Sequence, residues 1–201
     1  MADLRKNLNF LKENGFNVAP FGFAKNEGEA IQIAEEIGYP VVFKIPSDIH
    51  KTEVGGVLLN IHDISDLKKL GRKFVSKLDE KGIVFDGLIV QKQIPGVEII
   101  AGIKNDPVFG KVVMLGVGGI FAELYKDVSF RVCPIDENDA EDMINETKVK
   151  ELLSFRGMKI NKENLKNFLV KLSKLDVKEM DLNPVILNND GYWIVDARIM
   201  E

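Results

Sequence analysis

Four polar side chains near the end of the chain have types and spacing that could do chemistry. Asp181 and Asn183 lie in one strand-like run, and Asp196 and Arg198 lie in the next, with the turn sequence of 188–191 between them. A tight turn centred on that sequence pairs Asn183 with Asp196 and Asp181 with Arg198. Opposed residues share a face of a hairpin, and so do residues two apart. Oxygen donors gathered in this way suit Mg²⁺, which binds one or two protein oxygens together with substrate phosphates.

A second interpretation of this hairpin needs no metal. A solvent-facing sheet could carry the same residues, with an ion pair between Asp181 and Arg198. The strand register decides on which face of the hairpin these four side chains lie, because a slip of one residue moves every side chain to the other face.

The segment after the first strong strand pattern offers groups for phosphate chemistry. Lys44 ends an apolar run, and its ammonium group could contact phosphate as a point charge. Gly55 and Gly56 follow a polar loop, where backbone amides can approach a phosphate closely. His50 lies in that loop, and a neutral imidazole can attack phosphorus to form a covalent intermediate. Each feature also has an ordinary explanation, as a strand end, a turn or a surface histidine.

Two polar residues flank the middle of the chain, where Pro95-Gly96 marks a turn between two halves. Gln91 could read the edge of an adenine, and Glu98 could accept hydrogen bonds from ribose hydroxyls. Nucleotide sites often lie where two halves of a protein meet. Taken singly, both residues are common in strands.

Hydrophobic periodicity predicts helices and strands in a mixed order. Helical spacing of apolar residues and capping residues predict helices over Asp3–Asn14, Asn26–Ile37 and from Ser65 to about Leu78, and two or three more over 136–175. Short runs rich in β-branched residues predict strands at 41–45, 55–61, 87–91, 97–103, 111–117, 128–133, 180–187 and 192–199. We therefore expect an α+β protein with a first lobe of residues 1–94 and a second of residues 95–201.

Composition excludes several classes of protein. The 201 residues are 45% hydrophobic, so they can form a core, and the net charge of −4 is unlike that of a nucleic-acid binder. Apolar runs stay below the roughly 18 residues that cross a bilayer. The N-terminus has no apolar signal core, and the single Cys133 excludes an internal disulfide framework. We expect a cytoplasmic protein that binds neither nucleic acid nor membrane.

Several longer segments together resemble a known family, the ATP-grasp (beta) subunit of nucleoside-diphosphate-forming acyl-CoA synthetases of the acetate–CoA ligase (ADP-forming) type. The resemblance covers essentially the whole chain, and the segments occur in the family's order. They are GYPVVFK at 38–44, HKTEVGGV at 50–57, DPVFG at 106–110, GVGGIF at 116–121, KDVSFR at 126–131, EMDLNP at 179–184 and VDARI at 195–199.

The resemblance implies an ATP-grasp fold in which ATP or ADP is held between two α+β lobes. It implies that Lys44 contacts the nucleotide phosphates, that the Gly55-Gly56 loop covers them, and that Gln91 to Ile94 face adenine. By the same likeness Glu98 binds ribose, Asn183 and Asp196 hold Mg²⁺, and His50 carries the phosphoryl group.

The family also implies a reaction and a partner. The reaction is acyl-CoA + ADP + phosphate ⇌ carboxylate + CoA + ATP, and a CoA-binding alpha subunit completes the enzyme as a hetero-oligomer. Two alternatives stay open at this point. One is an ATP-grasp carboxylate ligase that works without a phosphohistidine, and the other is a non-catalytic nucleotide-binding regulatory module.

Overall fold

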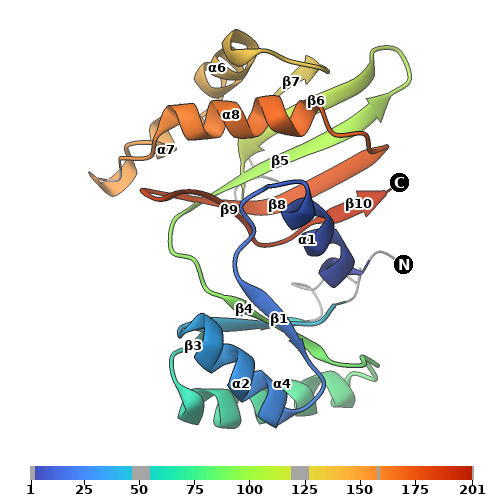
Figure 1. Cartoon of the computed structure of the whole chain (residues 1–201), viewed down its shortest axis with the longest axis vertical. Coiled ribbons are helices and arrows are strands. Elements are labelled where there is room, and N and C mark those ends of the chain that lie inside the picture. Colours follow the sequence, from blue (N-terminus) through green and yellow to red (C-terminus); the bar gives the residue numbers. More distant parts are fainter. Residues whose placement is uncertain (1–2, 47–54, 119–126, 158, 201) are drawn as a thin grey trace. The chain divides into compact units, whose positions relative to one another are not determined.

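The computed structural model describes residues 3–46, 55–118, 127–157 and 159–200 (Figure 1). The chain divides into two compact units. Unit 1 comprises residues 1–9 and 19–94, and unit 2 comprises residues 10–18 and 95–201. The later part of unit 1 ends at Ile94, and the segment 10–18 belongs to unit 2 although it lies in the first half of the chain. None of the helices in the described ranges is long and apolar enough to span a bilayer.

Unit 1 consists of a four-stranded antiparallel sheet with helices on one face. Its strands follow the order β1-β4-β2-β3. Its elements are α1 (Leu4–Glu13, shared with unit 2), β1 (Phe21–Ala24), α2 (Glu27–Ile37), β2 (Val41–Lys44), β3 (Val57–Ile61), α4 (Ile64–Glu80) and β4 (Leu88–Lys92). Strand β1 was not among the elements expected from the sequence, because four residues with a central glycine give too short a pattern to detect.

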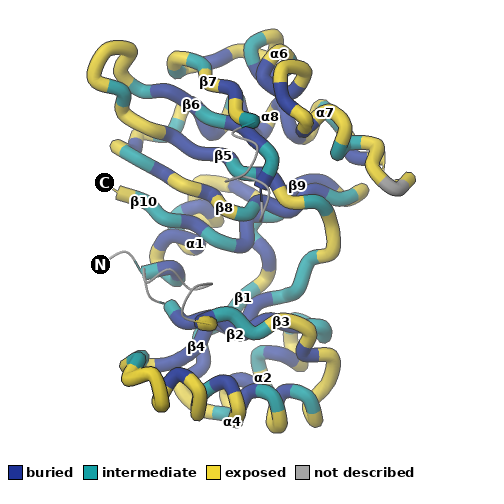
Figure 2. The backbone as a smooth tube through the Cα atoms, turned by 180° about the vertical axis from the view of Figure 1, so that it is seen from behind, coloured by how far each residue is buried: buried dark blue, intermediate teal, exposed yellow. Residues whose placement is uncertain are grey.

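Local sequence signals set the helix ends in unit 1. Asn26 caps α2 by accepting a hydrogen bond from the Glu29 amide, and Gly38 ends the helix with a φ of 76°. Asp63 caps α4, so this helix begins earlier than the Ser65 start expected from the sequence. Apolar residues of both helices then meet one face of the sheet around Phe43 and Phe74. In Figure 2 the outward turns of both helices are exposed, whereas the central strands β2 and β4 are buried along most of their length.

Unit 2 consists of a six-stranded antiparallel sheet with the path β10-β8-β5-β6-β7, and β9 pairs with β8. Its elements are β5 (Val97–Asp106), β6 (Gly110–Val117), β7 (Val128–Val132), α6 (Glu137–Glu146), α7 (Val149–Leu152), the 3₁₀ turn η2 (Phe155–Gly157), α8 (Lys162–Ser173), β8 (Glu179–Asn188), β9 (Gly191–Ile194) and β10 (Arg198–Met200). The strand expected over 192–199 is thus two strands, with residues 195–197 between them.

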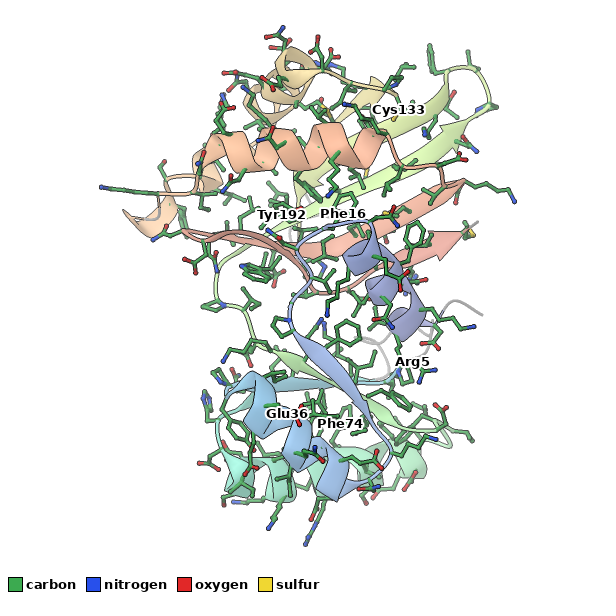
Figure 3. The ribbon with its side chains drawn as sticks, in the orientation of Figure 1. Arg5, Phe16, Glu36, Phe74, Cys133 and Tyr192 are labelled. Carbon is green, nitrogen blue, oxygen red and sulfur yellow. The ribbon has the colours of Figure 1, made fainter. Side chains whose placement is uncertain are left out.

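Helices α8 and α6 cover one face of this sheet. Leu165, Phe168 and Leu172 of α8 are almost fully buried, as are Leu115 and Leu182 of the strands. Phe168 also packs edge-on against Phe16, with ring centroids 6.1 Å apart, and lies 4.4 Å from the Tyr192 ring. Figure 3 labels Phe16 and Tyr192 in unit 2 and Phe74 in the separate core of unit 1. Asp181 and Asn183 of β8 lie on the opposite face of this sheet.

Candidate functional site

In unit 1, the residues Lys44 and Gln91 share one face of the sheet. Alternate residues Val41 and Phe43 of β2 belong to the core beneath the helices, so Lys44 points to the other face. Gln91 lies opposite Val42, and Lys44 lies opposite Ile89, on the neighbouring strands β2 and β4. Two of the residues expected to bind a nucleotide are therefore two register positions apart on the face away from α2 and α4.

Gln91 is a buried polar residue with an unused donor. Only 1% of its surface is exposed, and in the described part of the chain its Nε2 atom has no hydrogen-bond partner. A buried polar atom left in this way costs about 1–3 kcal/mol, so native structures rarely contain one without a reason. A ligand with an acceptor at this position would remove that cost.

The two glycines lie beside Lys44. Val57, directly after Gly56, is opposite Lys44 in the β2–β3 ladder, and the Ile45 amide donates to the Gly56 carbonyl over 3.0 Å. Gly55 has a φ of 74°, which only glycine adopts without strain. Lys44 itself is 6% exposed. The sequence-predicted set Lys44, Gly55 and Gly56 thus comes together where β2 ends and β3 begins.

The other predicted residues of this region divide between the units. Ile94 follows β4 and is half-buried, in unit 1. Glu98 lies in unit 2, on β5, with its side chain exposed and opposite Ile186 of β8. His50 lies outside the described residues, and nothing follows about its position.

The hairpin register expected from the sequence is confirmed. Asp181 is opposite Arg198 in the β8–β10 ladder, and Asn188 is opposite Gly191 in the β8–β9 ladder. The position of Asp196 opposite Asn183 falls between these two ladders, in the gap at 195–197. Asp181 and Asn183 are exposed, whereas Leu182 between them is fully buried, so both polar residues lie on the face away from the helices.

Asn183 lies in a β-bulge that was not predicted from the sequence. The register between β5 and β8 shifts between Ile99 and Ala101, so that Asn183 and Pro184 together stand opposite the single residue Ile100. Proline lacks a backbone donor, which favours such an interruption of the ladder, and bulges redirect side chains near active sites. Pro184 in the sequence was the one available signal.

The charged groups around Asp181 act on its carboxyl group in opposite directions. Asp181 is exposed as a residue, but neighbouring atoms partly desolvate its carboxyl group and raise its pKa. The charge of Arg198 lowers this pKa, and the nearby carboxylate of Asp196 raises it to a smaller extent. Asp196 also accepts a hydrogen bond from the Ala197 amide at 2.9 Å through its Oδ1 atom. The two neighbouring carboxylates of Asp181 and Asp196, together with the amide oxygen of Asn183, are oxygen donors of the kind that a hard divalent cation binds.

The chemistry of these donors fits magnesium shared with a phosphate better than a metal held by protein alone. Among the described residues there is no group of three or more His, Cys, Asp and Glu side chains that could hold a metal. Mg²⁺ commonly binds one or two carboxylates and completes its shell with water and substrate phosphates. The oxygens of Asn183 and Asp196 are compatible with that mode.

Comparison with known proteins agrees with this geometry. A family model described as the ATP-grasp domain matches residues 4–200. The chain is 42% identical to the beta subunit of acetate–CoA ligase (ADP-forming) I from Pyrococcus furiosus, over 94% of this chain and 87% of that subunit. It is 41% identical to acetate–CoA ligase (ADP-forming) I from Archaeoglobus fulgidus, over 96% of this chain but 30% of that protein.

A solved structure is similar along the whole chain. It is the dinucleotide-forming acetyl-coenzyme A synthetase 1 of Ca. Korarchaeum cryptofilum, in complex with coenzyme A, Ca-AMPCP and HgCl⁺. Its TM-score is 0.90 at 40% identity, and the match covers 98% of this chain and 92% of that one. A second structure of that synthetase contains coenzyme A and Mg-AMPPCP, with a phosphohistidine segment pointing towards the nucleotide binding site.

These matches define the class of protein: the chain belongs to the ATP-grasp family. Within that family it is an ATP-grasp subunit of the ADP-forming acetate–CoA ligase type, as the sequence resemblance indicated. The chain spans 30% of the A. fulgidus ligase and 87% of the P. furiosus beta subunit. The activity of a whole ligase, its acyl substrate and its partner are therefore matters for proposal.

Proposed function

We propose that this chain binds ADP and ATP and transfers a phosphoryl group between them and a phosphohistidine. The overall reaction is acyl-CoA + ADP + phosphate ⇌ carboxylate + CoA + ATP. The observation that carries the nucleotide part is Gln91, whose buried Nε2 donor lacks a partner in the described residues and lies on the same sheet face as Lys44. A purine supplies the acceptor that Gln91 lacks, and a polyphosphate supplies anions for Lys44.

In this proposal unit 1 supplies most nucleotide contacts. Lys44 neutralises phosphate charge as a point charge, and the amides near Gly55 and Gly56 add neutral donors. Gln91 donates to the base, Ile94 packs against it, and Glu98 of unit 2 accepts from ribose hydroxyls. Residues 1–94 and 95–201 act as the two lobes of the ATP-grasp fold.

Unit 2 supplies the metal ligands. Asn183 and Asp196 would hold Mg²⁺, and the Mg-AMPPCP complex of the K. cryptofilum enzyme supports that choice of metal. When bound, Mg²⁺ neutralises negative charge on the phosphate groups. Phosphoryl transfer needs little covalent chemistry from a protein, because positioning and charge neutralisation lower most of the barrier.

His50 is the phosphoryl carrier in this proposal. A neutral imidazole nitrogen forms the bond to phosphorus while the bond to the leaving phosphate oxygen breaks, and the reverse step regenerates ATP from ADP. A CoA-binding alpha subunit supplies the acyl chemistry, so that the enzyme is a hetero-oligomer. The cytoplasmic setting expected from the sequence is part of the proposal.

The test is labelling with [γ-³²P]ATP and Mg²⁺, with and without the partner subunit. We expect acid-labile, base-stable label in the wild-type chain, and none in His50→Ala. His62→Ala is the matched control, because His62 is the other histidine of the chain and should leave the label intact.

Two results would contradict the proposal. A fully active His50→Ala enzyme would identify an ATP-grasp ligase that works without a phosphohistidine. A wild-type chain that binds Mg-ATP but never becomes labelled or turns over with its partner would identify a regulatory module.

A further inference from the structure

Asn60 has a strained backbone at a bulge in the sheet of unit 1. Its φ is 62°, and among the described residues it is the only one other than glycine with a positive φ. The register between β2 and β3 shifts between Val41 and Phe43, so that Leu59 and Asn60 together stand opposite Val42. Asparagine tolerates this conformation better than most residues, yet it still carries a conformational cost. Such strain persists only where neighbouring contacts enforce it.

The contacts that enforce it come from Gln93, 33 positions further along the chain. The Asn60 amide donates to Oε1 of Gln93 over 2.7 Å. The Nε2 atom of Gln93 donates back to Oδ1 of Asn60 over 2.8 Å. Both hydrogen-bonding groups of the Gln93 side chain are therefore used by one strained residue. The pair is exposed, so burial of apolar surface does not explain it.

Further hydrogen bonds to other parts of unit 1 hold the same short segment. The Lys92 ammonium group donates to the carbonyls of Gly38 and Tyr39, over 3.0 and 2.7 Å. The backbone amides of Lys92 and Gln93 donate to the carbonyls of Pro20 and Pro40. The chain directly after the buried Gln91 is thus held at a fixed place by three separate parts of unit 1.

We propose that the Asn60–Gln93 amide pair positions the base-binding segment 91–94. This inference rests on the proposed function, in which residues from Gln91 to Ile94 face the purine. Gln93 acts as a positioning residue in it, because the Oε1 and Nε2 atoms of its side chain both bind Asn60. Loss of the pair would let residues 92–94 shift, and the base would lose contacts that the phosphates keep.

Loss of the Asn60–Gln93 pair should weaken binding of the base and leave binding of the phosphates nearly unchanged. Gln93→Ala should weaken Mg-ADP binding on the order of tenfold, about what the loss of one or two hydrogen bonds produces. Binding of Mg-tripolyphosphate, which has no base, should stay within twofold of wild type. A general loss of structure would weaken both ligands together.

Asn60→Gly tests the pair from its other side. Glycine accepts a φ of 62° without strain and keeps the amide that donates to Gln93, but it lacks the Oδ1 acceptor. We expect a two- to threefold weaker ADP affinity. The double variant Asn60→Gly/Gln93→Ala should be no weaker than Gln93→Ala, because the two residues act as one unit.

Arg72→Met is the matched control. It breaks another exposed side-chain pair of unit 1, in which Arg72 donates to Glu27 over 2.7 and 2.9 Å. This variant should leave both affinities unchanged. The measurement is isothermal titration calorimetry on the full chain, with the melting temperature of each variant recorded.

Three results would overturn the inference: wild-type ADP affinity in a folded Gln93→Ala, equal losses for ADP and tripolyphosphate, or fully additive effects in the double variant. A wild-type chain that binds neither ligand would instead contradict the proposed function, and the inference would fail with it. The two failures are therefore distinguishable.

Discussion

Arg198 lies directly opposite Asp181 across the β8–β10 ladder, yet burial and the charge of Asp196 still raise the pKa of the Asp181 carboxyl group. An arginine beside a carboxylate ordinarily lowers its pKa, so the opposing effects are the larger ones here. Desolvation is the largest of these effects, because the charge of Arg198 acts on Asp181 more strongly than that of Asp196, and the balance favours the protonated carboxyl group. A divalent cation bound there would reverse that balance.

The raised pKa predicts how stability changes with pH. A carboxyl group with a higher pKa in the folded state binds more protons there than in the unfolded state, so stability falls as pH rises through that window. The window begins near 3.8, the ordinary value for aspartate, and extends upward. Without divalent cations, Asp181→Asn should raise the melting temperature at pH 7 by about 2 °C at most, since the carboxyl group is only partly desolvated and water screens its charge.

The measurement is thermal unfolding by circular dichroism at several pH values in EDTA. The gain should vanish near pH 3, where the wild-type carboxyl group is already protonated. Asp79→Asn, on the exposed end of α4, is a suitable control. A gain that grows toward low pH would contradict this account of Asp181.

Mg²⁺ dependence should identify the metal ligands. Asp196→Asn replaces a charged oxygen donor with a neutral one, so we expect the Mg²⁺ concentration for half-maximal ATP formation to rise at least tenfold. Asn183→Ala should raise it less, because a neutral amide contributes less electrostatic energy than a carboxylate. The readout is coupled ATP formation with the partner subunit, titrated with MgCl₂ at saturating ADP.

The control for that titration is Asp176→Asn, in the connection between α8 and β8. It should behave as wild type. Equal Mg²⁺ requirements in Asp196→Asn and wild type would show that other oxygens hold the metal.

Sequence patterns predicted the strands and helices with clear periodicity, and they predicted the register of the last hairpin. The turn at 188–191 fixes that register, because a two-residue connection leaves one alignment that keeps Leu182 and Val185 inside. Lys44 and the glycines were also predictable, since adjacent strands bring residues near one turn together. The family resemblance extended these local inferences to a whole fold.

Other features depend on contacts between distant residues, and no local pattern reports them. The bulge at Asn183 arises from how β5 and β8 align, and Pro184 only hints at it. The pair between Asn60 and Gln93 joins residues 33 positions apart. The lack of a hydrogen-bond partner for the Gln91 Nε2 atom depends on the three-dimensional positions of the residues around it.

Replacement of Gln91 should increase the stability of the ligand-free chain and decrease its affinity for ADP. Gln91→Leu removes the unpaired donor and keeps a similar volume, so the chain without ligand should become more stable by about 1 kcal/mol. The same change removes the donor to the base and should weaken ADP affinity on the order of tenfold. Urea unfolding measures the first effect, and calorimetry measures the second.

Gln32→Leu provides the control, because Gln32 lies on the exposed surface of α2 and bonds to Glu36. It should change neither quantity in the direction expected for Gln91→Leu. If Gln91→Leu binds ADP as tightly as wild type, the amide does not contact the base.

We expect Lys44 to contribute to the affinity for the phosphates of the nucleotide and not to the affinity for its base. It is 6% exposed at the end of β2, beside the strand that follows Gly55 and Gly56. Lys44→Met keeps much of the aliphatic volume but removes the charge, so we expect Mg-ADP and Mg-tripolyphosphate to bind on the order of 10- to 100-fold more weakly. Adenosine, which has no phosphate, should bind Lys44→Met and wild type equally.

Lys44→Arg should restore binding only in part, because the guanidinium group is larger and planar while the site accommodates a compact ammonium group. Lys69→Met, on the exposed face of α4, controls for the loss of one positive charge. Competition titrations with a fluorescent ADP analogue give all of these affinities under one set of conditions. A Lys44→Met chain that loses adenosine and tripolyphosphate equally would show that Lys44 supports the fold of this region and does not bind phosphate.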